Sequence, residues 1–251
     1  MIMAHRPLFS IATPCYNSEK TIERTIKSVL QQEFKDYEYI IVDGGSTDGT
    51  LEIIKKYEPL FEGRMKWKSE PDKGIYDAFN KGVQRSSGYY CWNVNSDDWI
   101  EPDALERISK CINNEDDIIV GGVSYYDLNG NKYKTTIPTS DSIEFAYRTN
   151  RMIPHPATIV PKKVYEKYGC FDLKFRIAGD MDWFHRVYPQ DDITFHPLDI
   201  VINNMSDGGV STTSSFKKDA RERWLFYRKK YSNPFSIFGN MVIWFLRYLR
   251  K

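Results

Sequence analysis

The sequence is poor in cysteine and in net charge, and it has no long apolar run. Its 4 cysteines form no C-x-x-C pair, and a chain of 251 residues does not need disulfides for its core, so we expect reduced thiols in the cytosol. The 35 lysines and arginines nearly balance 34 acidic residues, which argues against a nucleic-acid binder. The uncharged run over residues 234–246 is shorter than the about 20 residues that span a bilayer. The N-terminus shows no apolar h-region, so we expect no secretory signal.

What is present is the composition of a globular protein. Hydrophobic residues make up 41% of the chain, and 15 glycines with 12 prolines are too few for a collagen-like sequence. Charge is uneven, because residues 217–251 hold ten cations against two acids and carry +8, which leaves −7 on the rest of a chain whose net charge is +1. We therefore predict one large domain over residues 1–215 and a basic tail over 216–251, with two different partners.

Apolar periodicity predicts that strands and helices alternate in the first half of the chain. Residues 8–13 form a short apolar run, and Ile22, Ile26 and Val29 then recur at helical spacing. The same patterns predict strands over 37–42, 65–69 and 89–94, a helix that includes residues 51–57, and helices over 75–83 and 104–112. Such alternation indicates an α/β fold, a mostly parallel central sheet with helices on both faces.

The second half is less regular. Residues 117–126 and 132–137, joined through Asn129-Gly130, predict a hairpin and therefore antiparallel strands. The remaining patterns predict strands over 157–160, 193–196 and 198–203, a helix over 180–187, and two helices in the tail.

Polar loops follow four of the predicted strands. In an open α/β sheet, ligands bind outside the carboxyl ends of the strands. Asp, Gly and Asn are also ordinary loop residues, so one such loop would say little. Four at one edge indicate a ligand site: Thr13-Pro-Cys-Tyr-Asn17, Asp43-Gly-Gly-Ser-Thr-Asp48, Glu70-Pro-Asp-Lys-Gly74 and Asn95-Ser-Asp-Asp98.

The same strings resemble those of a known family. In order and spacing, four strings resemble motifs of the family 2 glycosyltransferases: Thr13-Pro-x-Tyr-Asn17, Ile41-Val-Asp-Gly-Gly-Ser-Thr-Asp-Gly-Thr50, Asp72-Lys-Gly-x-Tyr-Asp-Ala-x-Asn-x-Gly82 and Asn95-Ser-Asp-Asp98. The resemblance covers about residues 7–215. It implies the GT-A fold in a single domain, and transfer of a sugar from a nucleotide diphosphate donor with inversion at the anomeric carbon.

The first two motifs are predicted to bind the nucleoside. The Asp43 carboxylate can accept the imide N–H of uracil, and the matching family residue contacts the base; capping of the following turn is the alternative. Thr13, Pro14 and Asn17 match positions that line the nucleoside. Tyr16 is assigned to the same site, although it could equally be a packing aromatic. Asp48 is expected to be a turn or cap residue.

The Asn95-Ser96-Asp97-Asp98 motif is predicted to hold a metal ion. Adjacent carboxylates repel one another unless a cation lies between them, and Mg²⁺ or Mn²⁺ suits oxygen ligands and substrate phosphates. The family carries Asp-x-Asp here, so Asn95 is a departure and the metal contact rests chiefly on Asp97, with Asp98 as support. Asn95 and Ser96 are expected near the nucleotide, and Asp98 near the donor sugar, with helix capping as the alternative for Asp98.

Three further charged residues precede or begin the helix over 75–83. Asp72 could contact the base or donor sugar, Lys73 could face the diphosphate, and Asp77 resembles a family residue that meets the sugar or ribose. For Asp72 and Lys73, the alternative is a cap and a surface lysine.

Asp180 is the predicted catalytic base. The stretch from Gly179 to Arg186 resembles the family's Glu-Asp motif that ends in Arg, with Gly179 in place of Glu. Asp180 aligns with the carboxylate that removes the proton from the acceptor hydroxyl. A structural N-cap is the alternative. Asp182, two positions on, should point elsewhere on the helix.

Two weaker predictions concern the acceptor or the phosphates. His155 lies between two prolines in an extended loop, where the family often places acceptor-site or phosphate-facing residues; a satisfied polar histidine is the alternative. The loop from Ser206 to Ser211 resembles a family Gly-Gly-x-Ser loop, and Ser211 could meet the diphosphate or form part of a turn.

The tail is predicted to lie on a membrane surface. Its second helix carries Phe235, Phe238, Val242 and Phe245 with flanking cations, a pattern typical of interfacial helices. The alternative is packing on the domain or on a second subunit in a homo-oligomer. Membrane binding would make a lipid-linked saccharide the natural acceptor and would place the protein at the cytosolic face of the membrane.

The predicted function is that of an inverting, metal-dependent glycosyltransferase of hexosyl or N-acetylhexosaminyl type. A UDP-sugar is the expected donor, a saccharide the acceptor, and polysaccharide biosynthesis the context. A dehydrogenase is excluded, because the turn over residues 13–17 lacks Gly-x-Gly-x-x-Gly. A non-catalytic sugar-nucleotide-binding or membrane-partner protein remains the alternative, because Asn95 and Gly179 depart from the family pattern.

Overall fold

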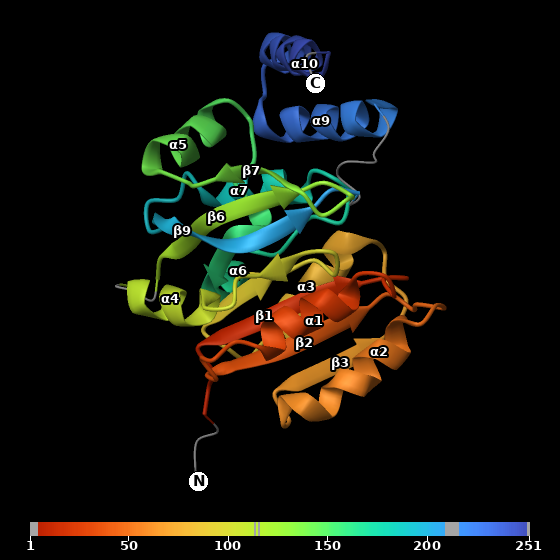
Figure 1. The fold of residues 1–251 in the computed structure, drawn as a ribbon. Helices are drawn as coiled ribbons and strands as arrows, with labels where there is room; N and C mark the ends of the chain where they lie inside the picture. The colour runs from red at the N-terminus through yellow and green to blue at the C-terminus, as the bar shows by residue number, and fades with distance from the viewer. Residues whose placement is uncertain (1–4, 113, 115, 209–215, 250–251) are drawn as a thin grey trace.

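The computed structural model describes residues 5–112, 114, 116–208 and 216–249. Within them, nine strands form one sheet in the order β3-β2-β1-β4-β8-β6-β9-β5, and β7 pairs with β6. Helices cover both faces of this sheet (Figure 1). The prediction of an α/β fold with a central sheet between helices is confirmed.

The first half of the sheet is parallel. Its strands, which pair in the order β3-β2-β1-β4, are β1 (Phe9–Cys15), β2 (Tyr37–Asp43), β3 (Met65–Ser69) and β4 (Tyr90–Asn93). The connections are α1 (Ile22–Leu30), α2 (Thr50–Tyr57) with the 3₁₀ turn η1 (Glu58–Phe61), and α3 (Ile75–Arg85). Every residue of β1 and β2 is buried, which explains their nearly continuous apolar sequence.

The second half is mixed. Its strands are β5 (Trp99–Ile100), β6 (Ile118–Tyr126), β7 (Lys132–Thr136), β8 (Thr158–Pro161) and β9 (Phe195–Ser206). The predicted hairpin is β6 with β7, and β8 pairs antiparallel with both β4 and β6. The two strands predicted over 193–203 are one strand, β9, which runs parallel to β6. Pro197 pairs with Val120 directly before a register shift of that ladder, and the strand continues past the proline.

Five more helical segments complete the domain: α4 (Ala104–Cys111), α5 (Ser140–Arg148), η2 (His155–Ala157), α6 (Lys162–Tyr168) and α7 (Gly179–Val187). The sequence patterns did not predict α5 and α6. α5 buries only Ile143 and Ala146, and the seven residues of α6 bury only Val164 and Tyr165, so neither helix has a clear apolar stripe.

The core has two main layers, one on each face of the sheet. α1, α2 and α4 pack on one face, and α5, α6 and α7 pack on the other. Neighbouring residues of one strand point to opposite faces of the sheet, so Ile11 and Ala12 belong to different core clusters. α3 lies so close to β1 that a Cβ on Gly82 would be only 2.9 Å from the Cβ of Ala12. Glycine is therefore required there for packing.

The two tail helices lie at the end of the molecule opposite β3 and α2 (Figure 1). α9 (Phe216–Lys230) contributes Phe226 and Tyr227 to the second core layer. α10 (Pro234–Tyr248) packs along α9 and buries only Ile237. No helix of the described residues is long and apolar enough to cross a membrane.

Candidate active site

A cavity of about 750 Å³ opens at the edge where the four parallel strands end. All four predicted loops contribute to its wall. The predicted site residues that line it are Pro14, Tyr16, Asn17, Asp72, Asn95, Ser96, Asp97, Asp98, His155 and Asp180. Thr13, Asp43, Lys73 and Asp77 lie outside the lining, and Ser211 lies outside the described residues.

Asp43 caps its own turn in this structure. Its carboxylate is fully buried and accepts hydrogen bonds from Gly45 N (3.0 Å), Ser46 N (2.9 Å), Ser46 Oγ (2.5 Å) and Ser69 Oγ (2.6 Å). Burial raises the pKa of Asp43, but these hydrogen bonds outweigh it, and the net pKa is lowered. Contact with a base would require this turn to rearrange.

The loop after β1 is tied to the loop after β2. Asn17 adopts φ 49°, its Oδ1 accepts from Thr47 N (2.9 Å), and its own N–H donates to Ser46 Oγ (2.7 Å). Thr13 is buried and accepts from Tyr39 OH. Tyr16, by contrast, is 63% exposed beside the cavity. Tyr16 is therefore not a core aromatic, and its ring is available to a ligand.

Asp48 is the turn residue that the sequence predicts. Its Oδ1 accepts from Thr50 N (3.0 Å) at the start of α2, and its Oδ2 accepts from Glu19 N (3.1 Å). This carboxylate therefore joins the first two loops to each other.

The loop after β3 places only one of its three predicted residues in the cavity. Asp72 lines the cavity while its Oδ1 accepts from Gly74 N (2.7 Å). Asp77 accepts from Lys73 N (2.9 Å) and pairs with Lys81 (3.3 Å), and the Lys73 side chain is exposed. In this conformation Asp77 and Lys73 stabilise the start of α3.

The loop after β4 brings two carboxylates and an amide together. Asp98, 1% exposed, accepts from Ser206 N (3.2 Å) and from Asn95 Nδ2 (3.2 Å). Burial and the nearby Asp97 raise the pKa of Asp98, and burial raises the pKa of Asp97. Arg24 donates a hydrogen bond to the backbone carbonyl of Asp97 (2.7 Å), and Asp97 lines the cavity.

The oxygens of this loop fit a hard divalent cation. Asn95 Oδ1 is buried and has no hydrogen-bond partner among the described residues, and Asp97 lines the cavity next to it. The described residues contain no cluster of three or more His, Cys, Asp or Glu side chains that could enclose a metal. One carboxylate and one amide oxygen suit an ion such as Mg²⁺, which takes its other ligands from water and substrate phosphates.

Asp180 lies in the first turn of α7 and reaches the cavity wall. Its Oδ1 accepts from Met181 N (2.7 Å) and from Tyr76 OH (3.2 Å), which also faces the carbonyl of Ile177 (2.6 Å). A Cβ on Gly179 would be 2.8 Å from the Tyr76 ring. The ring thus occupies the space that a side chain at position 179 would need, so glycine fits there in this conformation.

His155 has an unsatisfied ring nitrogen in the cavity wall. Its Nε2 is buried without a hydrogen-bond partner among the described residues, and its ring packs against Phe79 and Phe171 at centroid distances of 5.0 and 5.6 Å. Burial lowers the pKa of His155, and Asp180 partly opposes this effect. The alternative of a satisfied polar histidine therefore does not describe its Nε2.

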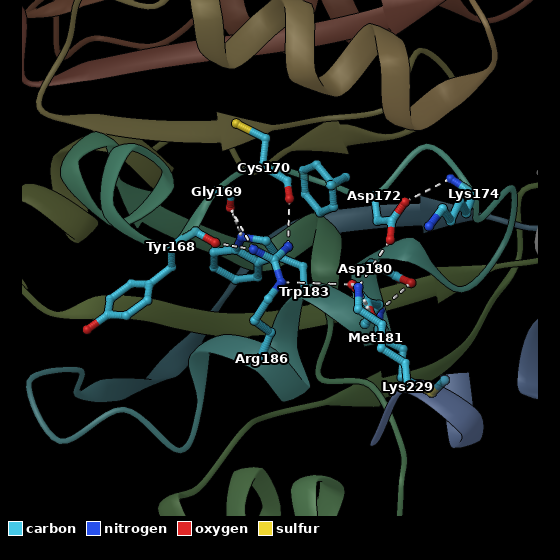
Figure 2. A network of polar contacts seen from close by, with 12 residues as sticks. Tyr168, Gly169, Cys170, Asp172, Lys174, Asp180, Met181, Trp183, Arg186 and Lys229 are labelled. Carbon is cyan, nitrogen blue, oxygen red and sulfur yellow. Dashed lines mark hydrogen bonds and ion pairs between the residues drawn. The ribbon is translucent and has the colours of Figure 1, made fainter. Parts of the chain in front are cut away.

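α7 is held by polar contacts to the end of α6 and to α9 (Figure 2). Arg186 donates to the carbonyls of Tyr168, Gly169 and Cys170 at the end of α6. Asp182, 4% exposed, pairs with Lys229 of α9 (2.8 Å). Asp182 thus points away from the cavity, as predicted from its position two residues after Asp180.

Sequence reasoning missed several residues of this region. Tyr76 stands inside a recognised motif but received no role, and Lys20 and Arg176 are cations that line the cavity. Glu222 belongs to the tail, yet it is buried against the segment before Asp180. Of these residues, only Lys20 and Arg176 could have been proposed from the sequence, because cations are expected near a site for an anionic substrate.

Comparison with known proteins gives concordant results. A model of "Glycosyl transferase family 2" matches residues 10–169. A PGL/p-HBAD biosynthesis glycosyltransferase of Mycobacterium bovis is 28% identical over 214 residues, covering 82% of this chain and 80% of that protein. Glycosyltransferase GlyA of Streptococcus pneumoniae is 31% identical over 180 residues, covering 67% of this chain and 26% of that protein.

Solved structures with the same fold include two that were determined with nucleotide sugars. S. aureus TarS 1-349 in complex with UDP-GlcNAc has a TM-score of 0.69 at 21% identity, covering 87% of this chain and 65% of that chain. The mannosyltransferase PcManGT from Pyrobaculum calidifontis, in complex with GDP-Man and Mn²⁺, has a TM-score of 0.66 at 16% identity, covering 95% and 69%. At these identities the similarity establishes the GT-A-like fold.

Proposed function

Because the chain belongs to glycosyltransferase family 2, we propose that it transfers a sugar from a nucleotide diphosphate donor to a saccharide acceptor with inversion. One observation carries the proposal. Asp97, from the loop after β4, and Asp180, from the first turn of α7, line the same cavity although 83 positions separate them. A site for the donor phosphates and a base for the acceptor therefore share one space.

Asp180 acts as the base in this proposal. Its carboxylate takes the proton from the acceptor hydroxyl as that oxygen attacks the anomeric carbon and the nucleotide diphosphate departs. Single displacement on the side opposite the leaving group gives inversion. The contacts from Met181 N and Tyr76 OH to Oδ1 keep the carboxylate in one orientation.

Asp97 and Asn95 Oδ1 would hold a divalent cation together with the donor phosphates. Bound there, Mn²⁺ or Mg²⁺ supplies positive charge that stabilises the leaving diphosphate. Lys20 and Arg176 line the same cavity and supply further positive charge. We assign His155 Nε2 to the acceptor or to a phosphate oxygen, because a buried nitrogen without a partner gains a hydrogen bond when a ligand enters.

The donor is proposed to be a UDP-sugar. Tyr16 offers an exposed ring on which uracil can stack, with Asn17 and Asp72 beside it in the cavity. Asp43 would contact the base only after its turn opens. Support comes from the structural neighbour that was solved with UDP-GlcNAc.

Nucleotide binding tests this function directly. Thermal unfolding is measured with UDP, dTDP, GDP, CDP and ADP, each with Mn²⁺ or with chelator. A ligand at about 100 times its Kd stabilises a protein by about 2.7 kcal/mol. We expect the largest shift with UDP and Mn²⁺ and then turnover in a screen of UDP-hexoses and UDP-N-acetylhexosamines. Binding without turnover of any donor would favour the non-catalytic alternative, and no binding would refute the proposal.

α10 is proposed to lie on the cytosolic membrane surface, which makes a lipid-linked saccharide the acceptor. Its exposed apolar side chains are Phe235, Phe238, Val242, Ile243, Phe245 and Leu246, and Leu249 directly after the helix is exposed as well. Exposed cations of the basic tail, such as Lys217 and Lys218, would meet anionic headgroups. Packing of the same face against a second copy of the chain is the alternative.

Flotation with vesicles distinguishes the two. The wild type should float with vesicles that contain phosphatidylglycerol and not with pure phosphatidylcholine vesicles. Phe238→Glu should abolish flotation, whereas Phe145→Glu, a matched change of an exposed phenylalanine on α5, should not. A dimer in solution that Phe238→Glu dissociates, together with no flotation, would favour the alternative.

A further inference from the structure

Glu222 of α9 binds the segment that leads into the predicted base. Its side chain is 6% exposed, and its two oxygens accept hydrogen bonds from three consecutive backbone amides: Arg176 N (2.7 Å), Ile177 N (2.8 Å) and Ala178 N (2.8 Å). Hydrogen bonds from amides to a carboxylate are shorter and stronger than those between neutral groups. One side chain of the tail thus satisfies every amide of residues 176–178.

These amides lie directly before α7, in which Asp180 is the second residue. A carboxylate at the beginning of a helix also interacts favourably with the partial positive charge of the helix N-terminus. The contact therefore fixes both the path of residues 176–178 and the start of the helix that carries Asp180.

A second contact from the same helix supports the first. Lys229 pairs with Asp182 (2.8 Å), within the first turn of α7. It also pairs with Asp172 (3.1 Å), which precedes the segment (Figure 2). Glu222 and Lys229 are seven positions apart and so lie on one face of α9. On another side, Tyr76 OH faces the carbonyl of Ile177 (2.6 Å) and Asp180 (3.2 Å).

We propose that Glu222 is a positioning residue, through which α9 keeps the Asp180 carboxylate in its reactive orientation. This role rests on the proposed function, in which Asp180 is the base. Among the described residues, the hydrogen bonds of Glu222 go to residues 176–178, and of these only Arg176 has a proposed role toward the donor. Loss of the contact should therefore lower kcat by a larger factor than it weakens the affinity for the donor nucleotide.

Glu222→Gln is the sharpest variant. Glutamine keeps the shape of the side chain but replaces one acceptor oxygen with an NH₂ group, which opposes backbone N–H donors. A displacement of about 1 Å at a reacting group can lower the rate about 100-fold, so we expect a 10- to 100-fold lower kcat for hydrolysis of the UDP-sugar found in the donor screen. The Kd for UDP with Mn²⁺ should rise by a smaller factor than kcat falls, because Arg176 is the one residue of 176–178 that is assigned to the donor.

Phe226→Leu is the matched control, because Phe226 is buried on the same helix, and its ring packs on His185 in the last turn of α7 without a hydrogen bond to residues 176–178. Amide hydrogen exchange over residues 176–178 is measured in both variants. Glu222→Gln should speed exchange there and lower kcat, and Phe226→Leu should do neither at a comparable loss of thermal stability.

The outcomes separate the two proposals. Unchanged kcat or unchanged amide exchange in Glu222→Gln, with an active wild type, would refute the positioning role alone. An equal loss of kcat in Phe226→Leu would also refute it, because general loosening of α9 would then explain the effect. A wild type that binds no nucleotide and turns over no donor would refute the proposed function, and with it the role of Glu222.

Discussion

Acidification should destabilise this protein through His185, a buried residue on α7. Lys230 Nζ lies 3.0 Å from its Nδ1, and its Nε2 lies 3.1 Å from the carbonyl of Arg151. Because an ammonium group only donates, Nδ1 accepts and Nε2 carries the proton, so the ring is neutral. Burial first, and then the charge of Lys230, lower the pKa of His185 from 6.5 to about 3.

The sign and size of the effect follow from this pKa. The unfolded chain takes up a proton near pH 6.5, whereas the folded protein does not until about pH 3, so the free energy of unfolding falls as the pH falls between these values. From pH 7.5 to pH 5, His185 alone should cost about 2 kcal/mol, at about 1.36 kcal/mol per pH unit below its unfolded pKa. Burial lowers the pKa of Lys230 to about 8, so Lys230 stays mostly charged over this range.

Urea unfolding at pH 7.5, 6.5, 5.5 and 5.0 measures the effect. His185→Gln keeps an acceptor for Lys230 and a donor for the Arg151 carbonyl but does not titrate, so its unfolding free energy should vary by about 2 kcal/mol less than that of the wild type. Burial also lowers the pKa of His155, and that contribution remains in both proteins. His5→Gln, at an exposed residue, is the control for loss of a histidine. Equal pH dependence of His185→Gln and the wild type would refute the reasoning.

Three further substitutions test the site and the fold. Asp180→Asn should lower kcat by about 10²- to 10⁴-fold while UDP binding with Mn²⁺ stays nearly unchanged; normal turnover would remove Asp180 as the base. Asp97→Ala should weaken UDP binding in Mn²⁺ but not in chelator, and equal weakening in both would move the metal elsewhere. Gly82→Val should destabilise the protein by about 1–3 kcal/mol in urea unfolding, since its Cβ would be 2.9 Å from that of Ala12; wild-type stability would show that α3 can shift from β1.

The elements with a strong period were predictable from the sequence, and the weakly patterned ones were not. β1 and β2 are apolar throughout because both of their faces are covered, and α1 has the spacing of Ile22, Ile26 and Val29. α5 and α6 bury only two residues each, which is too few to give the apolar period by which a helix is predicted. The sequence predicts two strands where the structure has β9, because Pro197 is a residue that commonly ends a strand.

The tail shows why charge and hydrophobicity alone described it incompletely. Its basic composition gave no sign that α9 contributes Phe226 and Tyr227 to the core, or that Glu222 binds residues 176–178. A buried glutamate is indistinguishable in sequence from the many exposed ones. Its partner amides lie more than 40 positions away, at a separation of 44 to 46 residues.

The sequence by itself determined which loops form the cavity. Parallel strands joined by helices end at one edge of a sheet, so the polar segments that follow β1 to β4 had to meet there. Only the tertiary structure decided where each side chain points. Asp43 turns into its own loop and Lys73 toward solvent, while Asp97, His155 and Asp180 reach the cavity. Side-chain direction depends on long-range packing, as with the Tyr76 ring beside Gly179, and local sequence patterns do not encode such contacts.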